Sequence, residues 1–379
     1  MKVTDTLESR QIPKPITDSR DRLVIVGLSG GVDSAVCALL LRRHGYDVQA
    51  LFMKNWEEDD RDGYCAAARD LADAEEICRR IHIPLHTVNF STEYWDQVFQ
   101  HSLIEFEKGR TPNPDILCNQ RIKFRAFLEH ALDLGAQHIA TGHYARITRD
   151  PDGIHLCKGL DSAKDQSYFL YTLGRTPLSR TLFPVGGLRK SDVRRLARDA
   201  GLPIHDKKDS TGICFVGERP FKAFLSRYIA PSPGEIQSPD GKVIGHHDGL
   251  AYYTLGQRQG LGIGGQRDAG SAPWYVADKD RERNVLVVAQ GRDHPLLYKR
   301  RLIAEQLHWI SGTAPEFPWR CQAKVRYRQP DQDCEVNGGE ENTCRVHFHT
   351  PQWAITPGQS VVFYRGDECL GGGIIRETE

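Results

Sequence analysis

A glycine- and serine-rich run lies between an apolar stretch and a helical pattern near the start of the chain. Its sequence is Gly27-Leu28-Ser29-Gly30-Gly31-Val32-Asp33-Ser34, and it joins the apolar residues 23–26 to an apolar helix predicted over residues 35–43. A strand, a turn of small residues and a helix start, in this order, direct backbone N–H groups at an anion. Walker-type loops end in Gly-Lys-Ser/Thr, which this run lacks, so γ-phosphate transfer is disfavoured. The run therefore predicts a different kind of nucleotide-phosphate site.

Strand and helix patterns alternate through the first half of the chain. Residues 23–28, 48–53 and 85–90 predict strands, and the spacing of apolar residues predicts helices over 71–81, 124–132 and 192–200, the last capped by Ser191. This alternation predicts an α/β fold with a doubly wound, Rossmann-like parallel sheet that binds ligands at the carboxyl ends of its strands. The loop 27–34, Met53 and Gly142 should all lie at that edge.

The pattern changes beyond about residue 217, where segments become short and are separated by Gly and Pro. Alternating runs at 285–289, 321–327, 343–348 and 360–364 predict antiparallel strands. We therefore expect a disordered arm (1–21), a catalytic α/β domain (22–217), a small β-rich central domain (218–296) and a C-terminal β-barrel (297–379).

Two of the ten cysteines stand in loop-like contexts. Cys118 ends the run 111–118, which holds two prolines and precedes a predicted helix, with Arg121 and Lys123 close in sequence; this setting favours a thiolate. Cys214 lies in a small-residue loop, 209–215. No Cys-x-x-Cys pair occurs, which argues against a zinc ribbon, a thioredoxin-like motif or an iron–sulfur cluster, and most of the other cysteines should be buried thiols.

Ten cysteines without a signal-peptide pattern suggest a reducing, cytoplasmic setting, and the charge balance is ordinary for a soluble enzyme. Acidic and basic residues balance at 50 each, and no apolar run approaches the roughly 20 residues that span a bilayer. Any cationic surface must therefore be local. Residues 324–328, which alternate cations with apolar or aromatic side chains, and the basic run 299–301 are candidates for contact with RNA.

Several longer strings occur together in one order. They are the loop 27–34, residues 52–56 (FMKNW), 111–119 (TPNPDILCN), 140–145 (ATGHYA), 164–169 (KDQSYF) and 211–215 (TGICF). Together they closely resemble the tRNA-specific 2-thiouridylases of the MnmA type, within the PP-loop ATP pyrophosphatase superfamily. The resemblance runs from about residue 22 to the C-terminus.

The resemblance implies a set of site residues. Cys118 matches the nucleophile, Cys214 the cysteine that carries a persulfide, and Asp115 a residue beside the target base. The remaining positions fall into three groups: ATP contacts at Gly27, Leu28, Ser29, Gly30, Gly31, Val32, Asp33, Ser34, Met53 and Gly142; target-base contacts at Asn113, Pro114 and Asp115; and tRNA contacts at His143, Lys164, Asp165, Gln166, Arg326, Tyr327 and Gln359.

The resemblance also implies an activity. The expected enzyme is an ATP-dependent tRNA sulfurtransferase that adenylates the C2 oxygen of the wobble uridine and replaces it with sulfur, releasing AMP and pyrophosphate. Mg²⁺ would accompany ATP, and no metal cluster is expected. A sulfur-carrier protein or a cysteine desulfurase would supply the persulfide, a Cys118–Cys214 disulfide would remain after transfer, and a monomer fits a tRNA-sized substrate. Attack by free hydrosulfide and by the intact persulfide both remain open.

Two other functions fit part of the sequence. A PP-loop ligase or amidotransferase acting on a small substrate would explain residues 27–34 but not two loop cysteines. A tRNA-binding module without catalysis would not need the intact loop, Asp115 and both cysteines.

Overall fold

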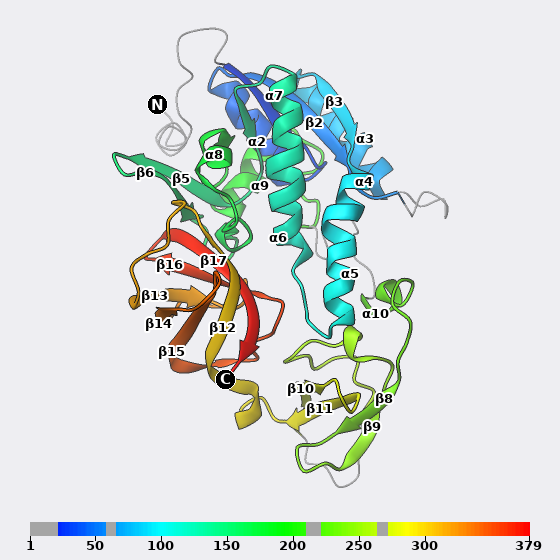
Figure 1. Ribbon diagram of the computed structural model, residues 1–379. Coiled ribbons are helices and arrows are strands. Elements are labelled where there is room, and N and C mark those ends of the chain that lie inside the picture. The colour runs from blue at the N-terminus through cyan, green and yellow to red at the C-terminus, as the bar shows by residue number, and fades with distance from the viewer. Residues whose placement is uncertain (1–21, 58–65, 210–220, 264–271) are drawn as a thin grey trace.

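The computed structural model describes residues 22–57, 66–209, 221–263 and 272–379. Cys214 and the N-terminal arm lie outside these residues. The chain forms three sheets. Figure 1 shows the barrel below the first sheet and the central domain at the lower end of α5 (Gln100–Glu107).

The first sheet has five parallel strands in the order β3-β2-β1-β4-β7, which confirms the predicted α/β class. Its strands are β1 (Leu23–Gly27), β2 (Asp47–Lys54), β3 (Leu85–Asn89), β4 (His138–Ala140) and β7 (Thr181–Leu182). Chain order reverses between β1 and β4, and crevices of this kind at the carboxyl ends of strands are where such sheets bind ligands.

Helices cover both faces of this sheet because β1 is apolar on both sides. Val24 and Val26 pack with one helix layer, whereas Ile25 packs with the other, and all three are fully buried. The first layer holds α2 (Val32–Arg43), α3 (Ala66–Ile81) and α9 (Lys190–Asp199). The second holds α4 (Ser91–Tyr94), η3 (Trp95–Phe99), α5 (Gln100–Glu107), α6 (Pro114–Cys118), η4 (Asn119–Ala126) and α7 (Phe127–Asp133).

The central sheet has four strands in the order β10-β11-β8-β9. They are β8 (Gly234–Gln237), β9 (Val243–His247), β10 (Trp274–Asp280) and β11 (Val285–Gln290), with α10 (Phe221–Leu225) and η6 (Leu250–Tyr252) beside them. The core of this domain includes Phe106 of α5, so the central sheet packs on the end of that helix.

The last six strands close into a barrel through pairing of β12 with β17. They are β12 (Tyr298–Trp309), β13 (Trp319–Lys324), β14 (Gln332–Gly338), β15 (Cys344–Trp353), β16 (Ser360–Arg365) and β17 (Glu368–Thr378), preceded by η7 (Pro295–Leu297). A hairpin from the first half of the chain, β5 (Ala145–Asp150) and β6 (Gly153–Lys158), extends this sheet, because β6 pairs with β17. The hairpin leads on to η5 (Ser167–Phe169) and α8 (Arg175–Ser179).

Three local predictions were wrong. The predicted strand 321–327 ends at Lys324, and residues 325–328 form bends and a turn. Helix α9 begins at Lys190 after Arg189, so Ser191 lies inside the helix and does not cap it. Cys118 does not precede a helix: α6 begins at Pro114, and Cys118 occupies its second turn. The two helix starts differ from prediction by a few residues, because helix ends are the least determined part of a sequence pattern.

Candidate functional site

The loop 27–34 forms a tight cradle at the carboxyl end of β1. Gly30 has a left-handed φ of +69°, and a Cβ there would lie 2.5 Å from the carbonyl oxygen of Asp70. The Ser34 hydroxyl accepts a hydrogen bond from Ser29 N–H at 3.2 Å and lies 3.1 Å from the Gly31 carbonyl oxygen, to which it donates. The first N–H groups of a helix have no partners within it, so the start of α2 is suited to bind an anion held over this loop.

The other predicted ATP contacts converge on this cradle. Met53 lies on the neighbouring strand β2, with its Cε 3.4 Å from the position of a Cβ on Gly27. Gly142 follows β4, and a Cβ there would lie 2.7 Å from Ser34 N. The backbone of residue 142 therefore lies directly against the helix start, and only a glycine leaves this approach open.

A cluster of charges fixes the helix start from the side. The Asp33 carboxylate accepts hydrogen bonds from Tyr144 Oη at 2.7 Å and from Lys190 Nζ at 2.7 and 2.8 Å. Lys190 also pairs with Asp209 at 2.8 Å. The Lys190 side chain is only 12% exposed. One buried cation thus links the loop to residue 209, five residues before Cys214.

Asp209 is held by two further cations. Lys164 Nζ lies 2.7 Å and Arg194 Nη2 lies 3.0 Å from its carboxylate oxygens. Burial alone would raise the pKa of Asp209, but hydrogen bonds and ion pairs with Lys164 and Lys190 lower it to about 2. Asp209 is therefore ionised throughout the physiological pH range. Lys190, Tyr144 and Asp209 have no signal in the sequence pattern, because their partners are distant along the chain.

Cys118 lies in a long helical column formed by α6, η4 and α7. Asn113 caps its start, with Oδ1 accepting a hydrogen bond from Asp115 N–H at 3.2 Å, and Pro114 occupies the first turn, where its missing N–H costs nothing. The Cys118 side chain is fully buried. A π-helical segment follows directly, a distortion that recurs at functional sites.

The column connects the nucleotide loop with the segment 164–169. At one end, Phe127 Cε1 lies 3.2 Å from the position of a Cβ on Gly27. Near Cys118, Asn119 Nδ2 donates to the Phe169 carbonyl at 3.1 Å. The centroids of the Phe169 and Tyr327 rings lie 4.4 Å apart. Tyr327 Oη donates in turn to the carbonyl of Lys164 at 3.4 Å. The structure therefore brings the predicted tRNA contacts Lys164 and Tyr327 close to the helix of Cys118.

Gln359 holds the loop that leads to the predicted target-base residues. Its Nε2 donates to the carbonyl oxygens of Thr111 at 2.8 Å and Pro112 at 3.3 Å. The barrel thereby fixes the approach to Asn113.

Other predicted tRNA contacts make contacts within the chain. His143 is buried against Phe124 and Phe183, and burial lowers its pKa well below the ordinary value. Asp165 accepts hydrogen bonds from two backbone N–H groups and the Ser167 hydroxyl, and Gln166 Oε1 accepts one from Tyr144 N–H.

Arg326 joins the central domain to the barrel. Its Nη2 donates to the carbonyl oxygens of Leu255 at 2.8 Å and Ala354 at 2.9 Å, and to the Thr356 hydroxyl at 2.8 Å. Contact of these residues with tRNA stays a prediction.

The described part of the chain holds neither a disulfide nor a metal-binding cluster. The eight cysteines there form no disulfide, and all but Cys321 are buried. No group of three or more His, Cys, Asp or Glu side chains in residues 22–57, 66–209, 221–263 and 272–379 could hold a metal ion. Within the same ranges, no helix has the length and apolarity needed to cross a bilayer.

Comparison with known proteins matches the whole of this architecture. Residues 22–218 match the tRNA methyl transferase HUP domain, residues 222–290 the tRNA methyl transferase PRC-barrel domain, and residues 299–375 the aminomethyltransferase β-barrel domain. A tRNA-specific 2-thiouridylase MnmA of Methylococcus capsulatus is 62% identical over 357 residues, which are 94% of this chain and 96% of the relative. The chain belongs to the tRNA-specific 2-thiouridylase family.

A second 2-thiouridylase MnmA, from Francisella tularensis, is 58% identical over 94% of this chain and 99% of its own length. The domain names include methyl transferase, whereas both relatives, matched along their whole length, are named 2-thiouridylases. Among solved structures, a 4-thiouridine synthetase in complex with RNA and ATP aligns with 54% of this chain and 50% of its own at 18% identity, with a TM-score of 0.34.

Proposed function

We propose that this 2-thiouridylase activates the C2 oxygen of the wobble uridine of tRNA with ATP and replaces it with sulfur. The observation that carries the proposal is the convergence of the loop 27–34, Met53 and Gly142 into one anion cradle, joined by the Phe127 contact to the helix that bears Cys118. A cradle without a Walker lysine is suited to hold pyrophosphate while the α-phosphorus reacts.

The first step is adenylation. The C2 oxygen of uridine attacks the α-phosphorus, the bond from that phosphorus to the bridging oxygen breaks, and pyrophosphate leaves. The Asp115 side chain, next to the capped turn at Asn113, would orient the base or move its proton. Neutralisation of the departing pyrophosphate is the chemistry that Mg²⁺ would supply on entering with ATP. The one carboxylate of the loop, Asp33, accepts hydrogen bonds from Lys190 and Tyr144 and so holds the start of α2 in place.

The second step transfers sulfur. In one route the Cys118 thiolate attacks the inner sulfur of a persulfide on Cys214; hydrosulfide leaves, a Cys118–Cys214 disulfide forms, and hydrosulfide then attacks C2 and expels AMP. In the other, the terminal persulfide sulfur attacks C2 directly before Cys118 releases it. Either route ends with a disulfide that an external dithiol reduces. Because Cys118 is buried, the residues that cover it must move before it reacts.

The test combines nucleotide and nucleoside analysis in a single turnover with tRNA, ATP, Mg²⁺ and a persulfide donor. We expect 2-thiouridine in the tRNA by mass spectrometry and AMP with pyrophosphate by chromatography. Cys118→Ala and Cys214→Ala should each abolish thiolation while ATP binding persists, and Cys37→Ala, a change at a buried cysteine of α2, serves as the matched control. Thiolation at the normal yield in either site variant would refute the two-thiol mechanism, and ADP with phosphate would refute adenylation.

A further inference from the structure

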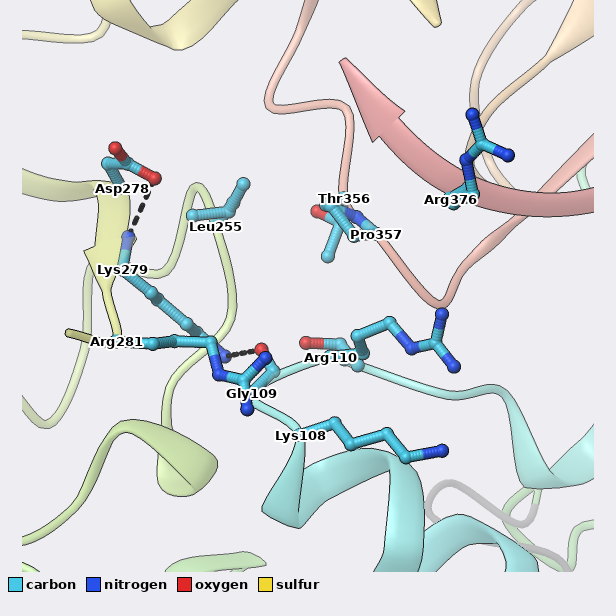
Figure 2. A pocket seen from close by; sticks show the side chains of 11 residues that line it. Lys108, Gly109, Arg110, Leu255, Asp278, Lys279, Arg281, Thr356, Pro357 and Arg376 are labelled. Atoms are coloured by element: carbon cyan, nitrogen blue, oxygen red, sulfur yellow. Dashed lines mark hydrogen bonds between the residues drawn. The ribbon is translucent and has the colours of Figure 1, made fainter. Parts of the chain in front are cut away.

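A cavity of about 390 Å³ lies where the three parts of the chain meet. The end of α5 contributes Lys108 and Arg110, the β10–β11 hairpin contributes Lys279 and Arg281, and β17 of the barrel contributes Arg376. Figure 2 shows these segments around the opening, with Lys279 and Arg281 both reaching toward Gly109. Three separate stretches of sequence thus deliver positive charge to one hollow.

The positive charge of the cavity is only partly neutralised. Asp278 is the one acidic residue among the described residues that line it. Arg110 pairs with Glu105 and, at 3.2 Å, with Glu305, and Lys108 pairs with Glu105 at 3.1 Å. Arg376 pairs with Glu377 at 2.7 Å. These three cations are therefore balanced from outside the hollow.

Lys279 and Arg281 are not balanced in this way. Within the described residues, no carboxylate oxygen lies within 4.0 Å of the Lys279 ammonium or the Arg281 guanidinium nitrogens. Lys279 Nζ donates to the carbonyl oxygen of Gly109 at 3.0 Å, which uses one of its three N–H bonds. Burial lowers the pKa of Lys279 to about 8, as expected for a cation that lacks a counter-charge.

The cavity also holds an unused donor. The Nε–H of Arg110 is buried and has no hydrogen-bond partner among the described residues. A buried donor without a partner costs free energy, so Arg110 is not fully satisfied by its two carboxylate partners. The unbalanced charge of Lys279 and Arg281, both in the lining of the cavity, points to an anionic ligand.

We propose that this cavity binds a backbone phosphate of the tRNA substrate, held by Lys279 and Arg281. The inference rests on the proposed function. Thr111 lines the cavity and lies two residues before Asn113, and Gln359 fixes Thr111 from the barrel side. A phosphate held here would set the position of the RNA relative to the target-base residues without reading its sequence.

The experiment is a binding titration of the full-length chain with tRNA over about 50 to 200 mM salt. Each phosphate contact contributes about 0.7–0.9 to the slope of log K against log salt, so the Lys279→Gln, Arg281→Gln double variant should lower the slope by about that amount. Arg281→Lys retains the charge and should keep the slope. Arg283→Gln is the matched control, because Arg283 lies at the turn of the same hairpin but pairs with Asp280 at 2.6 Å.

Other measurements separate the possible outcomes. An unchanged slope in the double variant, with an unchanged melting temperature, overturns the proposal. Saturable binding of inorganic phosphate that disappears in the double variant while the tRNA slope stays constant would assign the cavity to a free phosphate instead, and would also overturn it. Loss of the slope contribution in a chain that does not thiolate tRNA would support the phosphate site and refute the proposed function.

Discussion

Replacing Lys190 with methionine should destabilise the chain more than replacing Asp209, one of its acidic partners, with asparagine. Lys190 is the buried cation between Asp33 at the nucleotide loop and Asp209. Lys190→Met keeps most of the side chain's length but leaves two neighbouring carboxylates facing each other. In Asp209→Asn, by contrast, Lys190 still pairs with Asp33, and the amide oxygen still accepts hydrogen bonds. Lys164 and Arg194 lose a counter-charge in this variant, but they are 35% and 27% exposed, so solvent screens their charge.

The structure sets the size of the two effects. Breaking a buried ion pair costs about 3–5 kcal/mol. Asp33 and Asp209 are 31% and 32% exposed, so solvent screens them, and we expect about 2–3 kcal/mol for Lys190→Met and about 1 kcal/mol for Asp209→Asn. Because the residues share one network, the double variant should cost about 1 kcal/mol less than the sum.

Urea unfolding of the three variants measures these values, with Arg198→Gln as the control. Arg198 lies on the same helix but is 62% exposed and makes one contact of 3.8 Å with Asp206, so its loss should change the unfolding free energy by less than about 0.5 kcal/mol. Equal penalties for Lys190→Met and Asp209→Asn, or strict additivity in the double variant, would contradict the bridging role.

The pH dependence of the unfolding free energy gives a second test of the ion pairs around Lys190. The pKa of Asp209 is lowered to about 2, so its ion pairs stabilise the fold fully above pH 3.8 and are lost as pH falls through 2. Without Lys190 the pKa of this carboxyl should rise. The loss of unfolding free energy caused by Lys190→Met should therefore be constant above about pH 5 and become smaller below about pH 4. A penalty that grows on acidification would refute the argument.

Two further changes test the nucleotide cradle and the domain junction. Gly142→Ala places a Cβ 2.7 Å from Ser34 N, so the affinity for ATP, measured by calorimetry, should fall at least about tenfold. Gly174→Ala, which has open space around its Cβ, is the control and should leave the affinity unchanged. Equal affinities of the two variants would show that the backbone at residue 142 moves to accept the methyl group. Arg326→Ala removes donors to Leu255, Ala354 and Thr356, and should lower the melting temperature as well as tRNA affinity; a weaker salt slope at unchanged stability would instead favour direct phosphate contact.

The geometry of the cradle at residues 27–34 could be predicted from sequence because its parts obey local rules. A buried strand, small residues and a helix start determine the loop 27–34, and parallel-sheet topology then brings Met53 and Gly142 to the same edge. Each step depends on residues close in sequence or on a general property of such sheets.

The parts of the fold and of the candidate site that the sequence does not predict depend on contacts between distant segments. Residues 325–328 alternate like a strand, yet Arg326 is drawn out of the sheet by three acceptors on two other segments. Lys190 and Asp209 meet Asp33 only after the sheet has formed. The cationic cavity combines residues from the segment after α5, from the β10–β11 hairpin and from β17, so no window of sequence contains its pattern.

The hairpin of β5 and β6 has a consequence for any attempt to divide the chain. Because β6 pairs with β17, through Leu156 with Cys369 and Cys157 with Glu368, the first and last regions share one continuous ladder of main-chain hydrogen bonds. Cutting between them would expose an unprotected strand edge on each fragment, the kind of surface that recruits other chains into aggregates. Expression of either piece alone would thus remove a partner that its own backbone requires.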